Sequence, residues 1–145
     1  MDTLPPKFNS LRDKIAFEKV ARKRRYTQYA LDYAEAETAG IEAANHANIV
    51  PMVVSGMDAN GNSMAWKVNG GVCGYAYVTL RPATTSFARW LVKEHGWRKA
   101  YEGGISLMVS DYNQSMGRKA AHAEAMAKSL KGKGYSGVDW FERID

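Results

Sequence analysis

Two polar segments of the chain carry residue types suited to holding an anion. One follows an apolar run at residues 72–80, and the other follows an apolar run at residues 105–109. Each brings hydroxyl or amide side chains to the start of an expected helix, where free backbone N–H groups can bind a negative charge. Two cations near the start of the second helix oppose its dipole, and an anionic ligand would relieve this. The candidate anion- or ligand-binding residues are Arg81, Thr84, Thr85, Ser86, Ser110, Asp111, Asn113, Ser115, Arg118 and Lys119.

These residues form one site only if the two apolar runs are strands that point the same way. With both strand–helix–strand crossovers parallel and right-handed, we expect residues 81–86 and 110–115 to emerge at the same edge of the sheet. Helix capping alone accounts for most of the same residues, so a purely structural role is the competing interpretation.

A second candidate surface is a basic cluster near the N-terminus. Tyrosines follow it at helical spacing, so the segment could contact phosphates and stack bases. The simpler interpretation is a solvated basic face that continues into a tyrosine stripe facing the core. The nucleic-acid candidates are Lys19, Arg22, Lys23, Arg24 and Arg25, followed by Tyr26, Tyr29 and Tyr33.

No motif indicates catalysis, a metal site or a cofactor. Residues 132–137 have the letters of a dinucleotide fingerprint, but they follow an expected helix and precede a strand, which is the wrong order. His46, His95 and His122 show no ligand spacing, and Cys73 is the single cysteine. We therefore name no catalytic residue, no metal ligand and no cofactor, and we favour a binding role over an enzyme.

Length and composition favour one globular domain. The chain has 145 residues, 46% of them hydrophobic, with a formal net charge of +5. A chain of this length can bury a substantial core, and the positive charge favours acidic partners. It shows neither a signal peptide nor a long apolar segment, so we expect a cytoplasmic protein that does not enter a membrane.

The first part of the chain predicts a long helical arm over residues 10–47. Ser10, followed by Asp13, has the spacing of a helix cap, and neither Gly nor Pro interrupts residues 11–38. An unbroken helix to Gly40 would be about 45 Å long. Either it breaks near residues 24–27 into two packed helices, or one end projects toward a partner, which could be a second copy of the chain.

Residues 51–145 predict a core of class α+β or α/β. We expect a mixed sheet of four or five strands, centred on residues 72–80, with crossover helices at about 83–95 and 114–131. Asn69-Gly70 predicts a hairpin that joins residues 65–68 to the central strand. Alternation places Ala76 and Val78 on one face of that strand and Tyr75 and Tyr77 on the other, and we expect helices or a partner to cover both faces.

Three segments suggest a family. They are Gly-Gly-Val-Cys-Gly-Tyr-Ala-Tyr-Val at residues 70–78, Asn-Gln-Ser-Met-Gly-Arg-Lys at 113–119 and the closing Arg143-Ile144-Asp145. Over roughly residues 45–145 the chain resembles small uncharacterised proteins encoded by bacteriophages. The resemblance implies a phage accessory protein that acts in the cytoplasm of the bacterial host.

Together these observations rank three functions. The first is a non-enzymatic accessory protein that binds a host protein or an anionic ligand and interferes with a host process. The alternative is nucleic-acid binding through the basic N-terminal helix. The third is a nucleotide- or phosphate-binding enzyme that uses the sheet edge.

Overall fold

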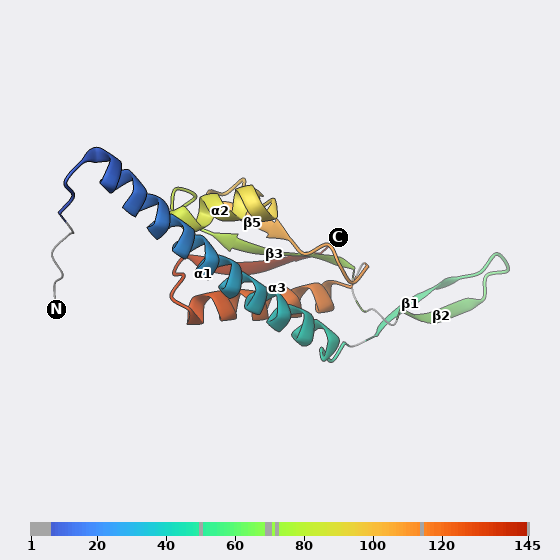
Figure 1. Cartoon of the computed structure of the whole chain (residues 1–145). Helices are drawn as coiled ribbons and strands as arrows, with labels where there is room; N and C mark the ends of the chain where they lie inside the picture. The colour runs from blue at the N-terminus through green and yellow to red at the C-terminus, as the bar shows by residue number, and fades with distance from the viewer. Residues whose placement is uncertain (1–6, 50, 69–70, 72, 114, 145) are drawn as a thin grey trace. The chain divides into compact units, whose positions relative to one another are not determined.

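The computed structural model describes residues 7–49, 51–68, 71, 73–113 and 115–144 (Figure 1). The described part contains three helices and two antiparallel sheets, an α+β fold. The elements are α1 (Leu11–Asn45), β1 (Met52–Met57), β2 (Ser63–Val68), β3 (Gly74–Leu80), α2 (Ser86–His95), β4 (Arg98–Lys99), β5 (Ile105–Met108), α3 (Met116–Gly132) and β6 (Val138–Ile144).

The expected long N-terminal helix is confirmed, and α1 is a single helix of 35 residues. Ser10 caps it as expected, because its hydroxyl accepts a hydrogen bond from the Asp13 N–H at 3.2 Å. One compact unit of the chain ends at Leu31 and the other begins at Asp32. Within the second unit, Tyr33, Ala36 and Ala44 of the helix are buried. The buried stripe therefore starts at the last of the three tyrosines.

The four-stranded sheet has the strand order β4-β5-β3-β6, and every neighbouring pair is antiparallel. Both β3-α2-β4 and β5-α3-β6 join strands that run in the same direction with a third strand between them. This is the split β-α-β arrangement repeated twice. The expectation of a mixed sheet is thus wrong in detail, although the α+β class and the crossover helices are confirmed.

The short strand β4 explains why the two central strands are antiparallel. It contains only Arg98 and Lys99, and the chain reverses over residues 100–104 before β5 begins. The sequence shows no strand signal between the first crossover helix and residues 105–109. From the sequence alone, residues 105–109 are therefore expected to follow the crossover directly and to run parallel to β3. In the structure β4 occupies that place, and β5 runs in the opposite direction. A strand of two residues has no alternation from which it could be recognised.

The expected hairpin at Asn69-Gly70 also needs correction. Those two residues lie outside the described part of the chain, but the strands on either side of them belong to different sheets. β2 pairs instead with β1, with Val54 opposite Trp66. Their turn is held by Asp58, whose carboxylate accepts hydrogen bonds from the N–H groups of Asn60 and Asn62, both at 2.9 Å. These hydrogen bonds lower the pKa of Asp58.

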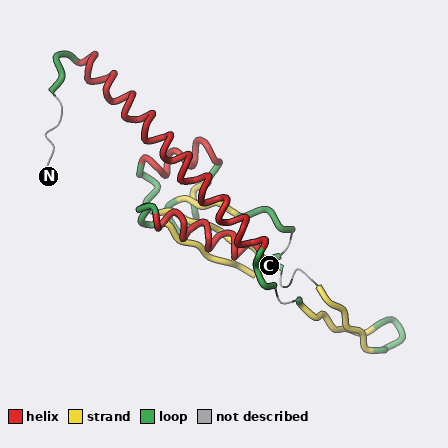
Figure 2. Tube along the Cα trace, turned by 60° about the horizontal axis from the view of Figure 1, so that its bottom comes forward, coloured by secondary structure: helices red, strands yellow, loops and turns green. Residues whose placement is uncertain are grey.

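The helices cover one face of the four-stranded sheet. Residues of β3 alternate between buried and half-buried, and its buried set includes Ala76, Val78 and Leu80. The two views show α2 and α3 on the same side of this sheet (Figures 1 and 2). These two helices contribute to the core Phe87, Ala88, Trp90 and Leu91 from α2 and Ala120, Ala123, Met126, Ala127 and Leu130 from α3. Neither α2 nor α3 covers the other face, so the expectation that helices cover both faces is wrong, whereas cover by a partner stays a prediction.

Buried polar contacts fix the last part of α1 within the second unit. The Trp97 indole N–H donates to the Tyr33 hydroxyl at 3.2 Å, and the Tyr33 ring stacks on His95 with centroids 3.9 Å apart. Burial raises the pKa of Tyr33 to about 12. The Tyr135 hydroxyl donates to the Asp32 carboxylate at 2.5 Å. These contacts join the helix to residues 95–97, which follow α2, and to Tyr135, which follows α3.

Gly40 gives a first test of this packing. A Cβ on Gly40 would lie 2.8–2.9 Å from ring atoms of the buried His122. Glycine to alanine inside a helix normally stabilises by about 1 kcal/mol, whereas overpacking a core costs about 1–3 kcal/mol. We therefore expect Gly40→Ala to lower the free energy of unfolding by up to about 2 kcal/mol in urea titrations. Gly132→Ala is the control because a Cβ there meets nothing within 4 Å. If both substitutions stabilise the protein, the packing of Gly40 against His122 is incorrect.

Candidate ligand-binding site

The structure does not bring the two polar segments together. β3 is antiparallel to β5, and Leu80 at the end of β3 pairs with Ile105 at the start of β5. Residues 81–86 therefore leave one end of the sheet. At the other end, Ser115 forms an isolated bridge with Cys73, just before β3 begins. The two strands are therefore not parallel, and the expectation of a shared anion site at one edge of the sheet is wrong.

Several of the candidate residues make structural contacts. Thr85 caps α2 by accepting from the Ala88 N–H at 3.2 Å, and Ser115 caps α3 by accepting from the Arg118 N–H at 3.4 Å. The Arg118 guanidinium donates to the Ala44 carbonyl at 3.1 Å, near the end of α1. This contact places a cation near the negative end of the helix dipole.

Lys119, another candidate cation, is buried. Its ammonium group donates to the Gly74 carbonyl at 3.2 Å and lies 5.0 Å from the centre of the Tyr75 ring. A buried ammonium needs such compensation, because an unpaired charge inside a protein is costly. The two cations near the start of α3 therefore bind main-chain carbonyls of the protein itself.

The segment before α3 is shaped by two residues with positive φ. Tyr112 has φ 73° and Asn113 has φ 54°. The Tyr112 hydroxyl lies 2.9 Å from Nδ1 of the buried His122. Burial lowers the pKa of His122, and the nearby Asp111 carboxylate opposes this shift. Burial also raises the pKa of Tyr112, and Asp111 adds to that effect.

The lowered pKa of His122 predicts a dependence of stability on pH. Between the folded pKa and the ordinary pKa of 6.5, the unfolded chain binds more protons than the folded chain. The contribution of His122 to stability is therefore complete above its ordinary pKa and is lost as the pH falls toward its pKa in the folded protein. We expect urea titrations to show lower stability at about pH 5.5 than at about pH 7.5, and a smaller change in His122→Gln. The exposed His46 provides the control His46→Gln. If His122→Gln retains the full dependence on pH, another group causes it.

The N-terminal candidates lie on α1 in the first unit. Lys19, Arg22, Lys23, Arg24 and Arg25 are all exposed. A shallow hollow beside them is lined by Val20, Lys23, Arg24, Thr27 and Gln28. The cluster is thus accessible to a ligand, and Tyr26 next to it is also exposed.

The helix-free face of the four-stranded sheet carries an aromatic pair. Tyr77 of β3 and Phe141 of β6 are directly opposed in the strand register. Their rings stack with centroids 4.8 Å apart and an angle of 16° between the planes. Tyr77 is half-buried, whereas 46% of Phe141 is exposed. We call this helix-free surface the open sheet face.

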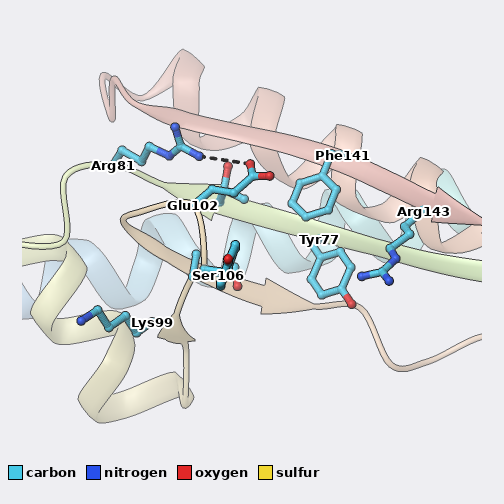
Figure 3. A pocket seen from close by; sticks show the side chains of 10 residues that line it. Tyr77, Arg81, Lys99, Glu102, Ser106, Phe141 and Arg143 are labelled. Carbon is cyan, nitrogen blue, oxygen red and sulfur yellow. Dashed lines mark ion pairs between the residues drawn. The ribbon is translucent and has the colours of Figure 1, made fainter.

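Cations surround the aromatic pair. A hollow of about 420 Å³ is lined by both rings, by the polar side chains of Thr79 and Ser106, and by Arg81, Lys99, Arg143, Tyr101 and Glu102. Figure 3 shows the two rings side by side, with Arg143 extending next to Tyr77 and Arg81 paired with Glu102. The Arg81–Glu102 pair is exposed and 3.7 Å long, so it contributes little to stability and leaves Arg81 accessible.

A second hollow continues the first along the sheet. It has a volume of about 460 Å³, shares Tyr77, Lys99 and Ser106 with the first hollow, and adds Arg98 and Met108. Tyr77 therefore stands between two concave regions. The open sheet face can accommodate an elongated ligand with both apolar and negatively charged parts.

The sequence does not reveal most of this surface. Of the residues that line its two hollows, only Arg81 and Ser110 are site candidates from the sequence. One signal in the sequence does point to this surface. Alternation places Tyr75 and Tyr77 on the face of β3 opposite its core-facing residues, but by itself this pattern predicts that the second face of the sheet is also covered. The partner ring, Phe141, lies 64 residues further along the chain, and only the β3–β6 register brings it to Tyr77.

Comparison with protein-family models, with curated proteins and with solved structures gives no match. Among the described residues, no group of three His, Cys, Asp or Glu side chains could hold a metal ion. None of the described helices has the length and apolar character needed to cross a membrane.

Proposed function

We propose that the protein is a binding protein for an anionic ligand and that the open sheet face holds the ligand. The observation that carries this proposal is the partly exposed Tyr77–Phe141 stack inside a hollow with three cations and one carboxylate. Aromatic residues and arginine are enriched at binding surfaces relative to the rest of the protein surface. An apolar platform with surrounding positive charge favours a ligand that combines rings or apolar groups with negative charge.

The electrostatics of the whole chain support the same ligand class. The formal net charge is +5. Such a charge raises the local concentration of anions and speeds their encounter with the protein. Arg81, Arg98, Lys99 and Arg143 add a local positive field at the two hollows.

Binding of polyphosphate, measured by titration at two salt concentrations, tests this proposal. We expect the triple variant Arg98→Gln, Lys99→Gln, Arg143→Gln to lose about tenfold or more in affinity, because hydrogen bonds to charged groups are the strong ones. The matched control removes the same number of charges from α1, as Arg22→Gln, Arg24→Gln, Arg25→Gln. Equal affinity for polyphosphate in the sheet variant and the native protein would rule out the open sheet face as the anion site.

The basic segment of α1 supports a second candidate function, nucleic-acid binding through that helix. Its five cations are exposed and adjacent, which suits contact with successive phosphates. Each cation that neutralises a phosphate should add about 0.9 to the magnitude of the salt slope on duplex DNA. A fall in this slope in the α1 triple variant, with no change in the sheet triple variant, would favour the helix over the sheet.

The biological setting stays a prediction. The resemblance to phage-encoded proteins is what suggests a host protein as partner, the bacterial cytoplasm as location and interference with a host process as outcome. Self-association through the N-terminal helix is a further prediction, and the sedimentation coefficient of the purified protein tests it. An enzyme acting on a nucleotide or phosphate is less favoured, because its expected residues lie at opposite ends of β3.

A further inference from the structure

We propose that the ligand of the open sheet face is a single-stranded nucleic acid, whose bases stack on the Tyr77–Phe141 pair and whose phosphates contact the surrounding cations. This inference rests on the proposed function and names the chemical class of the ligand. Proteins that bind single strands without sequence preference combine aromatic platforms with a positively charged groove.

The geometry of the aromatic pair suits base stacking. The rings are held nearly parallel by neighbouring strands, so the pair forms a rigid platform. β6 is an edge strand of the four-stranded sheet, and no described strand flanks Phe141 on the side away from Tyr77. A base can extend the stack on that side, because every nucleobase presents an apolar π face.

A third aromatic residue borders the same hollow. Tyr101 lies in the turn between β4 and β5 and is fully exposed, at 105% of its reference area. An exposed tyrosine at the rim offers a second stacking surface with little loss of side-chain entropy on binding. The hollow therefore has aromatic rings both at its base and at its rim.

The cations and the polar side chains complete the match to a nucleic acid strand. Lys99 lines both hollows, Arg143 follows Phe141 by two residues on β6, and Arg98 lies in the second hollow. Cations spread along an elongated surface suit a backbone with repeated phosphates better than one compact anion. Thr79 and Ser106 line the same hollow as the rings and the cations, where their hydroxyls can bond to base edges.

Base stacking distinguishes a single strand from other polyanions. In a duplex the bases stack on each other inside the helix, so their faces are not available to Tyr77 and Phe141. An acidic peptide or polyphosphate can use the cations but has no bases to stack. If the proposal is right, affinity depends on bases that are both present and unpaired.

Fluorescence anisotropy with four probes tests this dependence. The probes are a labelled thymidine strand of about twelve nucleotides, an abasic strand of the same length, the thymidine strand annealed to its complement, and polyphosphate. We expect the thymidine strand to bind at least about tenfold more tightly than the abasic strand and the duplex. A uridine strand of the same length shows whether RNA binds equally well.

Ring-removing variants assign the effect to the open sheet face. Phe141→Leu and Tyr77→Leu retain apolar bulk and remove the ring, so they test stacking with little effect on folding. We expect each to weaken thymidine binding by about tenfold and to leave polyphosphate binding unchanged. Tyr101→Ala, at a fully exposed position, tests the rim without any folding risk. Trp66→Ala removes an exposed aromatic residue of β2 and is the control, with no change expected.

The outcomes separate the inference from the proposed function. If thymidine and abasic strands bind equally and only the sheet cation variant loses affinity, the single-strand inference is overturned and the anion-binding function stands. A duplex that binds as tightly as the single strand overturns the single-strand inference in the same way. If neither the cation variant nor the ring variants affect any probe, both the inference and the proposed function are wrong.

Discussion

Replacing Gly137 with alanine should lower the free energy of unfolding by about 3 kcal/mol or more. Gly137 has φ 90°, a backbone conformation that alanine adopts only with strain. A Cβ at this position would also lie far inside van der Waals contact of the Arg81 carbonyl oxygen. The main chain cannot move aside there, because the Arg81 N–H donates to the Gly137 carbonyl at 3.1 Å where β3 ends and β6 begins.

Gly134 provides a matched control for this substitution. It has φ 96° and lies in the same connection between α3 and β6, but a Cβ there meets nothing within 4 Å. Gly134→Ala should cost only the strain of positive φ, about 1–2 kcal/mol. Urea titrations of both variants measure the difference. Equal losses would mean that the close approach of residue 137 to Arg81 does not occur.

Removing both rings of the Tyr77–Phe141 pair should give the largest loss of ligand affinity. We expect the double variant Tyr77→Leu, Phe141→Leu to bind a thymidine strand about 30-fold or more weakly than the native protein. The loss should be smaller than the product of the two single effects, because each ring holds the other in place. A double-mutant cycle by anisotropy measures this coupling.

The pair Phe141 and Trp66 gives the comparison for this cycle. The two residues belong to different sheets, so the effects of Phe141→Leu and Trp66→Ala should add. If the effects of Tyr77→Leu and Phe141→Leu on affinity also add strictly, the two rings do not act as one stacked platform.

The sequence predicts the elements of this fold well where local signals are strong. The caps at Ser10, Thr85 and Ser115 are all formed as expected. Each of these depends on side chains that bond to a backbone only a few residues away. Alternation along β3 also predicts correctly which of its residues face the core.

The arrangement of the strands could not be predicted in the same way. The direction of β5 depends on β4, a strand of two residues whose pairing is decided by tertiary contacts. Asn69-Gly70 has a strong local signal for a hairpin, yet the preceding strand pairs with β1. Local turn propensity therefore did not decide which strands pair.

The candidate site depends on the same non-local information. Arg118 and Lys119 resemble ligand-binding cations in the sequence because their sequence neighbours give them no partner. Their partners are the carbonyls of Ala44 and Gly74, which are 74 and 45 residues away. Tyr77 and Phe141, by contrast, resemble core residues, because the sequence does not show that one face of the sheet has no helix over it.

The most direct test of the open sheet face as the ligand site is a nuclear magnetic resonance titration. Uniformly ¹⁵N-labelled protein is titrated with the thymidine strand while the backbone amide shifts are followed. We predict that the largest changes occur at Tyr77, Ser106, Phe141 and Arg143, and that residues 19–25 of α1 change little. Changes confined to residues 19–25, with the amides of β3, β5 and β6 unaffected, would contradict the account.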